Sequence, residues 1–125
     1  MANVARVLAG LLAAFFIVMG LGFWFRLDQT IASFAVIPDG LLGRASIRAD
    51  FGGLFFGVGL MSAMAAWRTS RTCALGALLL LAIALTGRLV SLAMDGAAPG
   101  GMMPMLVEAA GIAILAWARH VWRAA

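Results

Sequence analysis

The stretch Arg48-Ala49-Asp50-Phe51-Gly52-Gly53-Leu54-Phe55-Phe56-Gly57-Val58-Gly59 places two opposite charges at the mouth of an apolar, glycine-studded segment. An ionisable side chain inside a bilayer costs about 3 kcal/mol on insertion scales, so it marks a functional site whose partner charge should be sought nearby. We therefore expect the functional centre of this chain to include Asp50 and a basic residue on a neighbouring helix.

The composition is that of an integral membrane protein. Of the 125 residues, 65% are hydrophobic and 11% are charged, and the mean hydropathy is +1.08. Soluble domains are roughly half apolar and a quarter charged. The net charge of +4 comes from arginines that stand singly rather than on one basic face, so nucleic acid is not an expected partner. The single cysteine, Cys73, has no partner for an internal disulfide.

Four apolar segments have the length needed to cross about 30 Å of hydrocarbon. They are residues 4–25, 47–67, 72–94 and 104–122. The tight connection Arg68-Thr69-Ser70-Arg71 makes the second and third helices antiparallel neighbours. Gly96 ends the third helix at a position that favours a left-handed backbone, and Pro104 suits the first turn of the fourth. We predict an all-α, integral membrane four-helix bundle, formed by one domain of residues 1–125.

The first apolar segment allows a second interpretation, a cleaved signal peptide. Arg6 precedes the apolar run, and Ser33-Phe34-Ala35 loosely resembles a cleavage site. The run is longer than a typical signal core, however, and Arg26 and Asp28 interrupt the approach to that site. We expect a membrane helix instead.

Residues 27–46 form a long connection rich in turn signals, after which Ser46 is the predicted N-cap of the second helix. Leu27, Ile31 and Phe34 share one helical face, which predicts a short helix lying in the membrane interface. The alternative is that the first helix simply extends outward through these residues.

Arginines are distributed unevenly between the two ends of the predicted bundle. One end carries Arg6, Arg68, Arg71, Arg119 and Arg123. At the other end, Arg26, Arg44 and Arg48 are balanced by Asp28, Asp39, Asp50 and Asp95. The positive-inside rule then predicts that both termini are cytoplasmic. All basic residues are arginine, and Ala and Gly are abundant, as in GC-rich bacterial genomes, so we expect a multi-pass protein of the bacterial inner membrane.

Counting from the tight connection places Asp50 and Arg88 at the same depth. Each lies roughly 26 Å from the arginine-rich end at 1.5 Å per residue, and opposite charges on adjacent helices predict an ion pair. Asp50 also shares a helical stripe with Gly53 and Gly57. Small residues four apart allow close helix approach, so Asp50 is expected to point into a tight interface.

The stripe of Arg88, Ser91 and Asp95 extends this polar layer, and folding back the last helix brings Glu108 level with Ser91. The predicted ligand-binding residues are Arg48, Asp50, Arg88, Ser91, Asp95 and Glu108. Three carboxylates around Arg88 predict that one of them holds a proton, because like charges and desolvation disfavour the ionised form. The alternative is structural: the charges fix helix register, and Glu108 caps its own helix.

No metal centre or cofactor is predicted. Thioethers suit Cu(I), but the methionines near the predicted outer loop are also ordinary gap fillers; they are Met94, Met102, Met103 and Met105. His120 lies among arginines and is expected to be an interfacial anchor rather than a metal or haem ligand. Seven aromatic residues suit either a pocket for a flat ligand or plain packing: Phe15, Phe16, Phe23, Trp24, Phe51, Phe55 and Phe56.

Two paired motifs carry a resemblance to a known family. They are Arg48-x-Asp50-Phe-Gly52-Gly53, with Gly57 and Gly59 downstream, and Gly87-Arg88-Leu-Val, followed by Asp95-Gly96 and Glu108. The chain resembles the small bacterial membrane proteins grouped as domain of unknown function 4345, which are similar to DoxX-like four-helix proteins. Some DoxX-like proteins associate with quinone-linked or thiol redox systems. The resemblance implies no activity, but it points to the charged layer.

Three functions fit these observations. The first is an outward-facing polar pocket that binds a small amphipathic or anionic molecule, such as a lipid or quinone headgroup. The second is a structural or accessory subunit that packs on another membrane protein or on a second copy. The third is an enzyme with Glu108 or Asp50 as general acid or base on a lipid-soluble substrate, which no nucleophile or cofactor motif supports.

Overall fold

All the regular structure is α-helical in the part of the chain that the computed structural model describes, residues 1–123. The helices are α1 (Ala2–Phe25), α2 (Leu27–Ala32), α3 (Gly40–Arg68), α4 (Arg71–Asp95) and α5 (Met102–Val121). The four long helices are all long and apolar enough to cross a membrane. The chain is therefore an all-α membrane bundle of four long helices, as predicted, and the last two residues of the predicted domain lie outside the described range.

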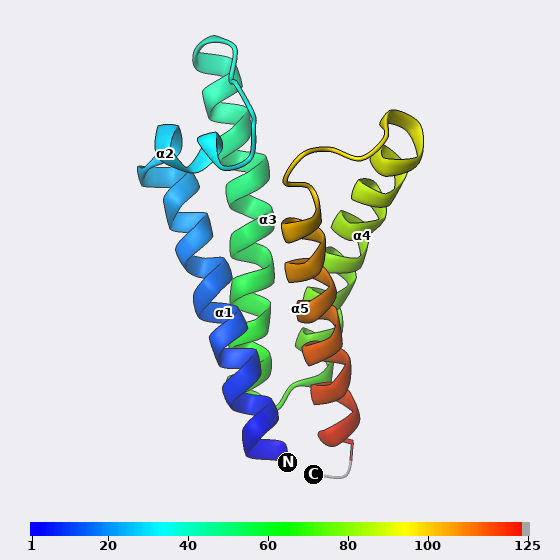
Figure 1. Cartoon of the computed structure of the whole chain (residues 1–125). Helices are drawn as coiled ribbons and strands as arrows, with labels where there is room; N and C mark the ends of the chain where they lie inside the picture. Colours follow the sequence, from blue (N-terminus) through cyan, green and yellow to red (C-terminus); the bar gives the residue numbers. More distant parts are fainter. Residues whose placement is uncertain (124–125) are drawn as a thin grey trace.

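The long helices form two pairs that diverge toward one end. Helix α1 packs along α3 and α4 packs along α5, whereas contacts between the pairs are fewer (Figure 1). The first residues of α1 and the last residues of α5 lie together at the end where the pairs converge, which we call the terminal end. Helix α2 and the α4–α5 loop lie at the opposite end, which we call the open end.

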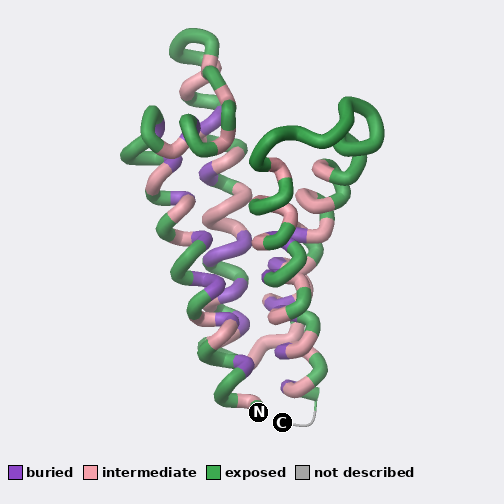
Figure 2. The backbone as a smooth tube through the Cα atoms, in the orientation of Figure 1, coloured by how far each residue is buried: buried purple, intermediate pink, exposed green. Residues whose placement is uncertain are grey.

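Burial follows these contacts. Buried positions line the faces between helices, and the α4–α5 loop is exposed (Figure 2). Large apolar side chains such as Val7, Val18 and Ile83 are exposed on the outer faces. An outward apolar surface on all four long helices indicates a lipid environment, because in water it would be an unstable hydrophobic patch.

The tight connection between α3 and α4 is confirmed. Thr69 is left-handed, with φ of 49°, and the Ser70 hydroxyl accepts a hydrogen bond from the Cys73 N–H at 3.2 Å. At the far end of α4, Gly96 has φ of +89°, in the region that favours glycine. Pro104 is the third residue of α5, where its missing N–H breaks no helical hydrogen bond.

Helix α3 begins seven residues earlier than the predicted residue 47, and its N-cap is Asp39 rather than Ser46. Gly40 does take a positive φ, +61°, but the chain turns directly into the helix there, and the Gly43 N–H bonds to the Asp39 carbonyl. At about 1.5 Å per residue, 29 residues span about 43 Å, more than the hydrocarbon thickness. The first turns of α3 therefore extend past the end of α1 (Figure 1).

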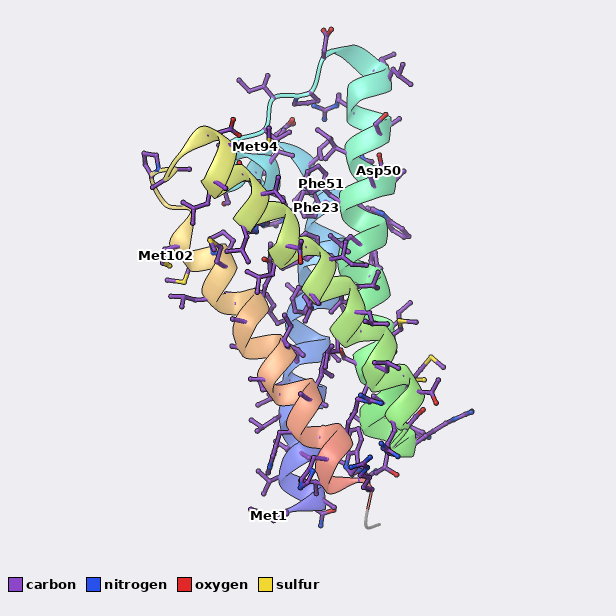
Figure 3. All side chains as sticks on the ribbon, turned by 90° about the vertical axis from the view of Figure 1, so that its right-hand side faces the viewer. Met1, Phe23, Asp50, Phe51, Met94 and Met102 are labelled. Carbon is purple, nitrogen blue, oxygen red and sulfur yellow. The ribbon has the colours of Figure 1, made fainter. Side chains whose placement is uncertain are left out.

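The connection after α1 contains the predicted short helix. Arg26 breaks the helical path with φ of −130° and ψ of 52°, so α2 is a separate element rather than an extension of α1. Leu27 and Ile31 are buried against Phe23 and Ile47, and Phe34 packs on the same cluster. This face is the one expected from the spacing. Figure 3 shows Phe23 next to Phe51, whose rings stack at 5.4 Å.

Candidate functional site

The buried charge of this protein is an ion pair between α4 and α5. The Arg88 Nε donates to the Glu108 Oε1 at 2.7 Å. The Glu108 side chain is only 10% exposed, and that of Arg88 is 36% exposed. Arg88 lies about two turns before the end of α4, and Glu108 lies about two turns after the start of α5. Because the two helices are joined by a short loop, equal distances from the loop bring the two residues level.

The second carboxylate oxygen of Glu108 is buried and has no hydrogen-bond partner. Within residues 1–123, only Ser62 Oγ and Glu108 Oε2 are buried side-chain oxygens or nitrogens in this condition. A serine hydroxyl in a helix is able to bond a carbonyl of its own preceding turn after a change of rotamer, without any other group. A carboxylate oxygen accepts only, and it needs a donor from another group. Glu108 Oε2 therefore leaves an acceptor available inside the bundle.

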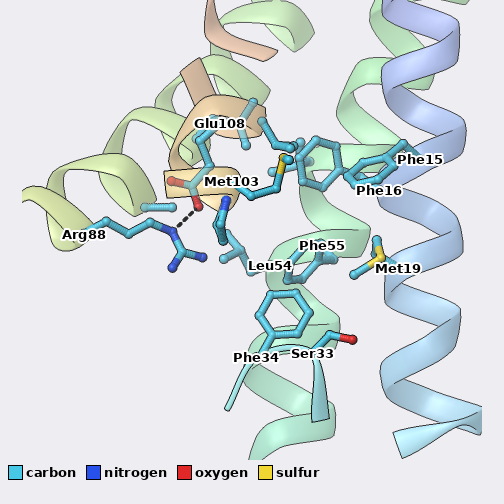
Figure 4. A pocket seen from close by; sticks show the side chains of 15 residues that line it. Phe15, Phe16, Met19, Ser33, Phe34, Leu54, Phe55, Arg88, Met103 and Glu108 are labelled. Carbon is cyan, nitrogen blue, oxygen red and sulfur yellow. Dashed lines mark hydrogen bonds and ion pairs between the residues drawn. The ribbon is translucent and has the colours of Figure 1, made fainter. Parts of the chain in front are cut away.

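A cavity of about 190 Å³ adjoins the ion pair. Figure 4 shows Arg88 and Glu108 on one side of it, with Phe15, Phe16 and Phe55 across from them. The complete lining comes from all four long helices and the segment after α2: Phe15, Phe16, Met19, Ser33, Phe34, Leu54, Phe55, Val58, Leu81, Ala84, Arg88, Met103, Pro104, Val107 and Glu108. Apart from the ion pair and Ser33, these side chains are apolar.

A lateral groove of about 490 Å³ between α3 and α4 continues from the cavity. It shares Phe34, Leu54 and Arg88, among others, with the cavity and adds Phe51 and Gly87. A Cβ atom at Gly87 would meet nothing within 4 Å, so this position leaves the groove open. The cavity thus connects to the outer surface between two helices.

Packing of aromatic and small residues positions the walls. Phe55 lies at the centre of an aromatic cluster, with ring centroids 5.6 Å from Phe16, 5.2 Å from Phe23 and 5.7 Å from Phe34. Across the bundle, a Cβ atom at Gly111 would lie 2.7 Å from a Leu81 methyl group. The missing side chain lets α5 approach α4 one turn below Glu108, which holds the carboxylate close to Arg88.

Comparison with known proteins adds a family to this geometry. The model of the family described as "Domain of unknown function (DUF4345)" matches residues 4–119. The chain belongs to this family. No significant match was found among curated proteins or among solved structures. The DUF4345 match spans all four long helices, so the ion pair and the cavity lie within the family domain.

The predicted Asp50–Arg88 pair is wrong. In this DUF4345 chain Asp50 is exposed, and its side chain makes no hydrogen bond or ion pair within residues 1–123. The stripe of close approach on α3 contains Gly52 and Gly59 rather than Gly53 and Gly57. Successive helical residues are 100° apart, so the prediction selected a neighbouring face and turned Asp50 away from its expected partner.

Arg48 and Trp24 join α1 to α3 instead of forming the rim of the site. The Arg48 Nε donates to the Trp24 carbonyl at 3.1 Å, and the Trp24 Nε1 donates to the Arg48 carbonyl at 3.2 Å. The close approach at Gly52 allows this exchange, since a Cβ there would lie 2.5 Å from the Trp24 Nε1.

The remaining predicted residues separate into two groups. Ser91 lines the lateral groove, and its hydroxyl donates to the exposed Asp95 carboxylate at 3.1 Å. Asp95 makes no ion pair with Arg88, so the expected convergence of three carboxylates does not occur. Among the described residues, only Glu108 pairs with the arginine. Glu108 is also the seventh residue of α5, beyond the first turn, so the expectation that it caps the helix is wrong.

Some cavity residues carry no sequence signal of their own. Phe15, Phe16 and Phe55 were among the aromatic residues expected either to line a pocket or to pack, and they line the cavity. Phe34 and Met103 do so as well, but Phe34 follows the short helix α2 and Met103 lies in the first turn of α5, so each is next to a connection whose path the sequence does not predict. Only the folding of the connections over the bundle brings them to the cavity.

Proposed function

We propose that this DUF4345 protein binds a small amphipathic, lipid-soluble molecule in the cavity, with its polar head on the Arg88–Glu108 pair. The observation that carries the proposal is the buried Glu108 Oε2, which lacks a partner beside an otherwise apolar cavity. Buried polar atoms are almost always hydrogen-bonded, and exceptions mark strain, function or a missing partner.

The surroundings favour an amphipathic ligand. An apolar wall stabilises the body of a ligand by excluding water, and a few polar groups fix its orientation. Here Arg88 and Glu108 are those polar groups. The lateral groove gives a ligand dissolved in the bilayer a path that does not cross the aqueous phase. We place the protein in the bacterial inner membrane, with the open end outward, following the positive-inside rule.

The test uses a variant that fills the cavity. Ala84 lines both the cavity and the groove, so Ala84→Phe should occupy the space of the ligand. Ala93→Phe makes the same change at an exposed position of α4 that lines neither space, and it serves as the control. Wild type and both variants are purified in mild detergent, and bound small molecules are identified by native mass spectrometry.

We expect a bound molecule in the wild type and in Ala93→Phe, and its loss in Ala84→Phe. Equal retention in all three proteins would place any bound lipid outside the cavity. A stoichiometric partner chain without a small molecule would instead support the accessory-subunit function.

A further inference from the structure

We infer that the ligand has a neutral hydroxyl group as its polar head, carried on an apolar body about the size of one ring. This inference rests on the proposed function and specifies its ligand class. It follows from the charges and hydrogen-bonding groups that Arg88 and Glu108 leave available, and from the size of the cavity.

The charge balance argues against an anionic head. The Arg88 charge is already compensated by Glu108 at 2.7 Å, so a second anion would meet a carboxylate in an apolar cavity. Like charges in such surroundings repel strongly, because little water screens them. A cationic head faces the same difficulty with Arg88. A neutral head avoids both.

Hydrogen-bonding capacity then selects among neutral heads. Glu108 Oε2 is an acceptor without a donor, and the terminal amino groups of Arg88 are donors that make no hydrogen bond within residues 1–123. A hydroxyl donates one hydrogen bond and accepts others, so it satisfies both residues at once. An ether or ketone oxygen only accepts, and it would leave Glu108 Oε2 unsatisfied. Oε2 is itself closed off in this structure, so ligand binding requires the last torsion of Glu108, which is broad, to turn the carboxylate toward the cavity.

The size of the cavity limits the body of the ligand. An apolar protein cavity of about 150 Å³ binds benzene, so about 190 Å³ admits one ring with a hydroxyl and a small substituent. Phe15, Phe16 and Phe55 provide aromatic surface on the wall opposite the ion pair. Aromatic rings in contact favour offset or edge-to-face packing, which suits a phenol. A longer tail would leave through the groove between α3 and α4.

Three probes with the same 4-ethylphenyl body and small head groups test the head group. They are 4-ethylphenol, 4-ethylanisole and 4-ethylbenzoate, which at pH 7 present a neutral donor, a neutral acceptor and an anion. Binding is followed in detergent-solubilised protein by NMR titration of the methyl groups of Leu54 and Val107, which line the cavity. We expect 4-ethylphenol to bind about tenfold or more tightly than either other probe, since both lose a hydrogen bond to a charged group.

A charge variant should reverse this order. Glu108→Gln removes the negative charge and leaves Arg88 uncompensated, so 4-ethylbenzoate should bind more tightly than 4-ethylphenol. Asp95→Asn removes an exposed carboxylate outside the cavity and should leave the order unchanged.

The possible outcomes separate the two proposals. Equal affinity for the phenol and the anisole, or tighter binding of the benzoate to the wild type, would overturn the hydroxyl inference while leaving a ligand cavity. If no probe shifts the cavity methyl groups, the proposed function itself fails. These wild-type comparisons stand even if Glu108→Gln does not fold.

Discussion

At the scale of single residues, the ion pair of Arg88 with Glu108 is the feature on which the proposed ligand binding depends. The pair places a compensated charge and an unpartnered acceptor beside the same apolar cavity. Asp50, which the sequence favoured as the partner, remains exposed. Removal of the Glu108 carboxylate, rather than that of Asp50, should therefore lower the stability of the bundle.

A double-mutant cycle measures this pairing. We expect Arg88→Gln and Glu108→Gln to show a coupling of about 1–3 kcal/mol in the free energy of unfolding, since a hydrogen bond between charged groups is broken in a partly buried place. Unfolding is followed by SDS titration of detergent-solubilised protein. The matched cycle of Arg88→Gln with Asp50→Asn should show no coupling. Equal coupling in both cycles would mean that Arg88 does not prefer Glu108.

At the scale of secondary structure, close helix approach depends on which glycine stripe faces a neighbour. On α3, a Cβ atom at Gly59 would lie 2.9 Å from the Ile17 main-chain nitrogen and 3.3 Å from the Ala13 carbonyl oxygen. Backbone atoms do not move aside as a flexible side chain does. At Gly53, by contrast, the same Cβ would meet nothing within 4 Å.

Alanine substitutions at these two glycines should therefore change the free energy of unfolding in different directions. Gly59→Ala should destabilise the protein by about 1–3 kcal/mol through overpacking. Gly53→Ala should be neutral or stabilise it by up to about 1 kcal/mol, because alanine favours the helix. SDS unfolding of both variants checks this. A cost at Gly53 without one at Gly59 would assign the α1–α3 interface to the stripe that contains Asp50.

An exposed ion pair joins α2 to α3, in addition to the packing of Leu27 and Ile31 on Ile47. The Arg44 guanidinium donates to the Asp28 carboxylate at 2.7 Å, and this hydrogen bond, with the charge of Arg44, lowers the pKa of Asp28 below its ordinary value of 3.8. A carboxyl group with a lowered pKa stabilises the folded state above its unfolded-state pKa. That contribution is lost as the pH falls through the folded-state pKa.

The Asp28–Arg44 contact should therefore show a defined pH dependence. Hydrogen exchange of the α2 amides should be slower in the wild type than in Asp28→Asn at pH 7. After correction for intrinsic exchange rates, the difference should persist to about pH 5 and shrink below about pH 4. It should also shrink in high salt, because exposed charges are screened. A difference that is absent at pH 7 would show that the pair does not hold α2.

At the scale of the whole molecule, the two ends of the bundle differ in charge. Five arginines and no acidic residue lie toward the terminal end: Arg6, Arg68, Arg71, Arg119 and Arg123. All five acidic residues lie toward the open end or in the ion pair. Arg6, Arg71 and Arg119 also link helices. The Arg6 Nε of α1 donates to the Ala66 carbonyl of α3 at 3.0 Å. The Arg71 Nε donates to the Arg119 carbonyl at 3.2 Å, and the Arg119 Nε donates to the Arg71 carbonyl at 3.1 Å.

Cysteine labelling tests the orientation that this distribution predicts. In a Cys73→Ala background, exposed single cysteines are introduced as Asn3→Cys, Arg68→Cys and Pro99→Cys. An impermeant thiol reagent applied to intact cells should label only Pro99→Cys, because the α4–α5 loop is expected to face outward. All three should react in permeabilised cells. Labelling of Arg68→Cys in intact cells would show that the orientation is the opposite of the predicted one.

The sequence by itself determined the features that depend only on neighbouring residues along the chain. These are the lengths of the apolar segments, the tight turn between α3 and α4, the glycine at the end of α4, and the positions of Arg88 and Glu108 within apolar segments. Hydropathy and local backbone preference act over a few neighbouring residues, so they are readable in order along the chain. The start of α3 was missed because Gly40 and Gly43 read as turn residues, although one initiates the helix and the other lies within it. Tertiary structure alone decided which face of α3 meets α1, and hence that Glu108 rather than Asp50 pairs with Arg88. A shift of one residue rotates a helix face by 100°, and only close packing between helices distinguishes such alternatives.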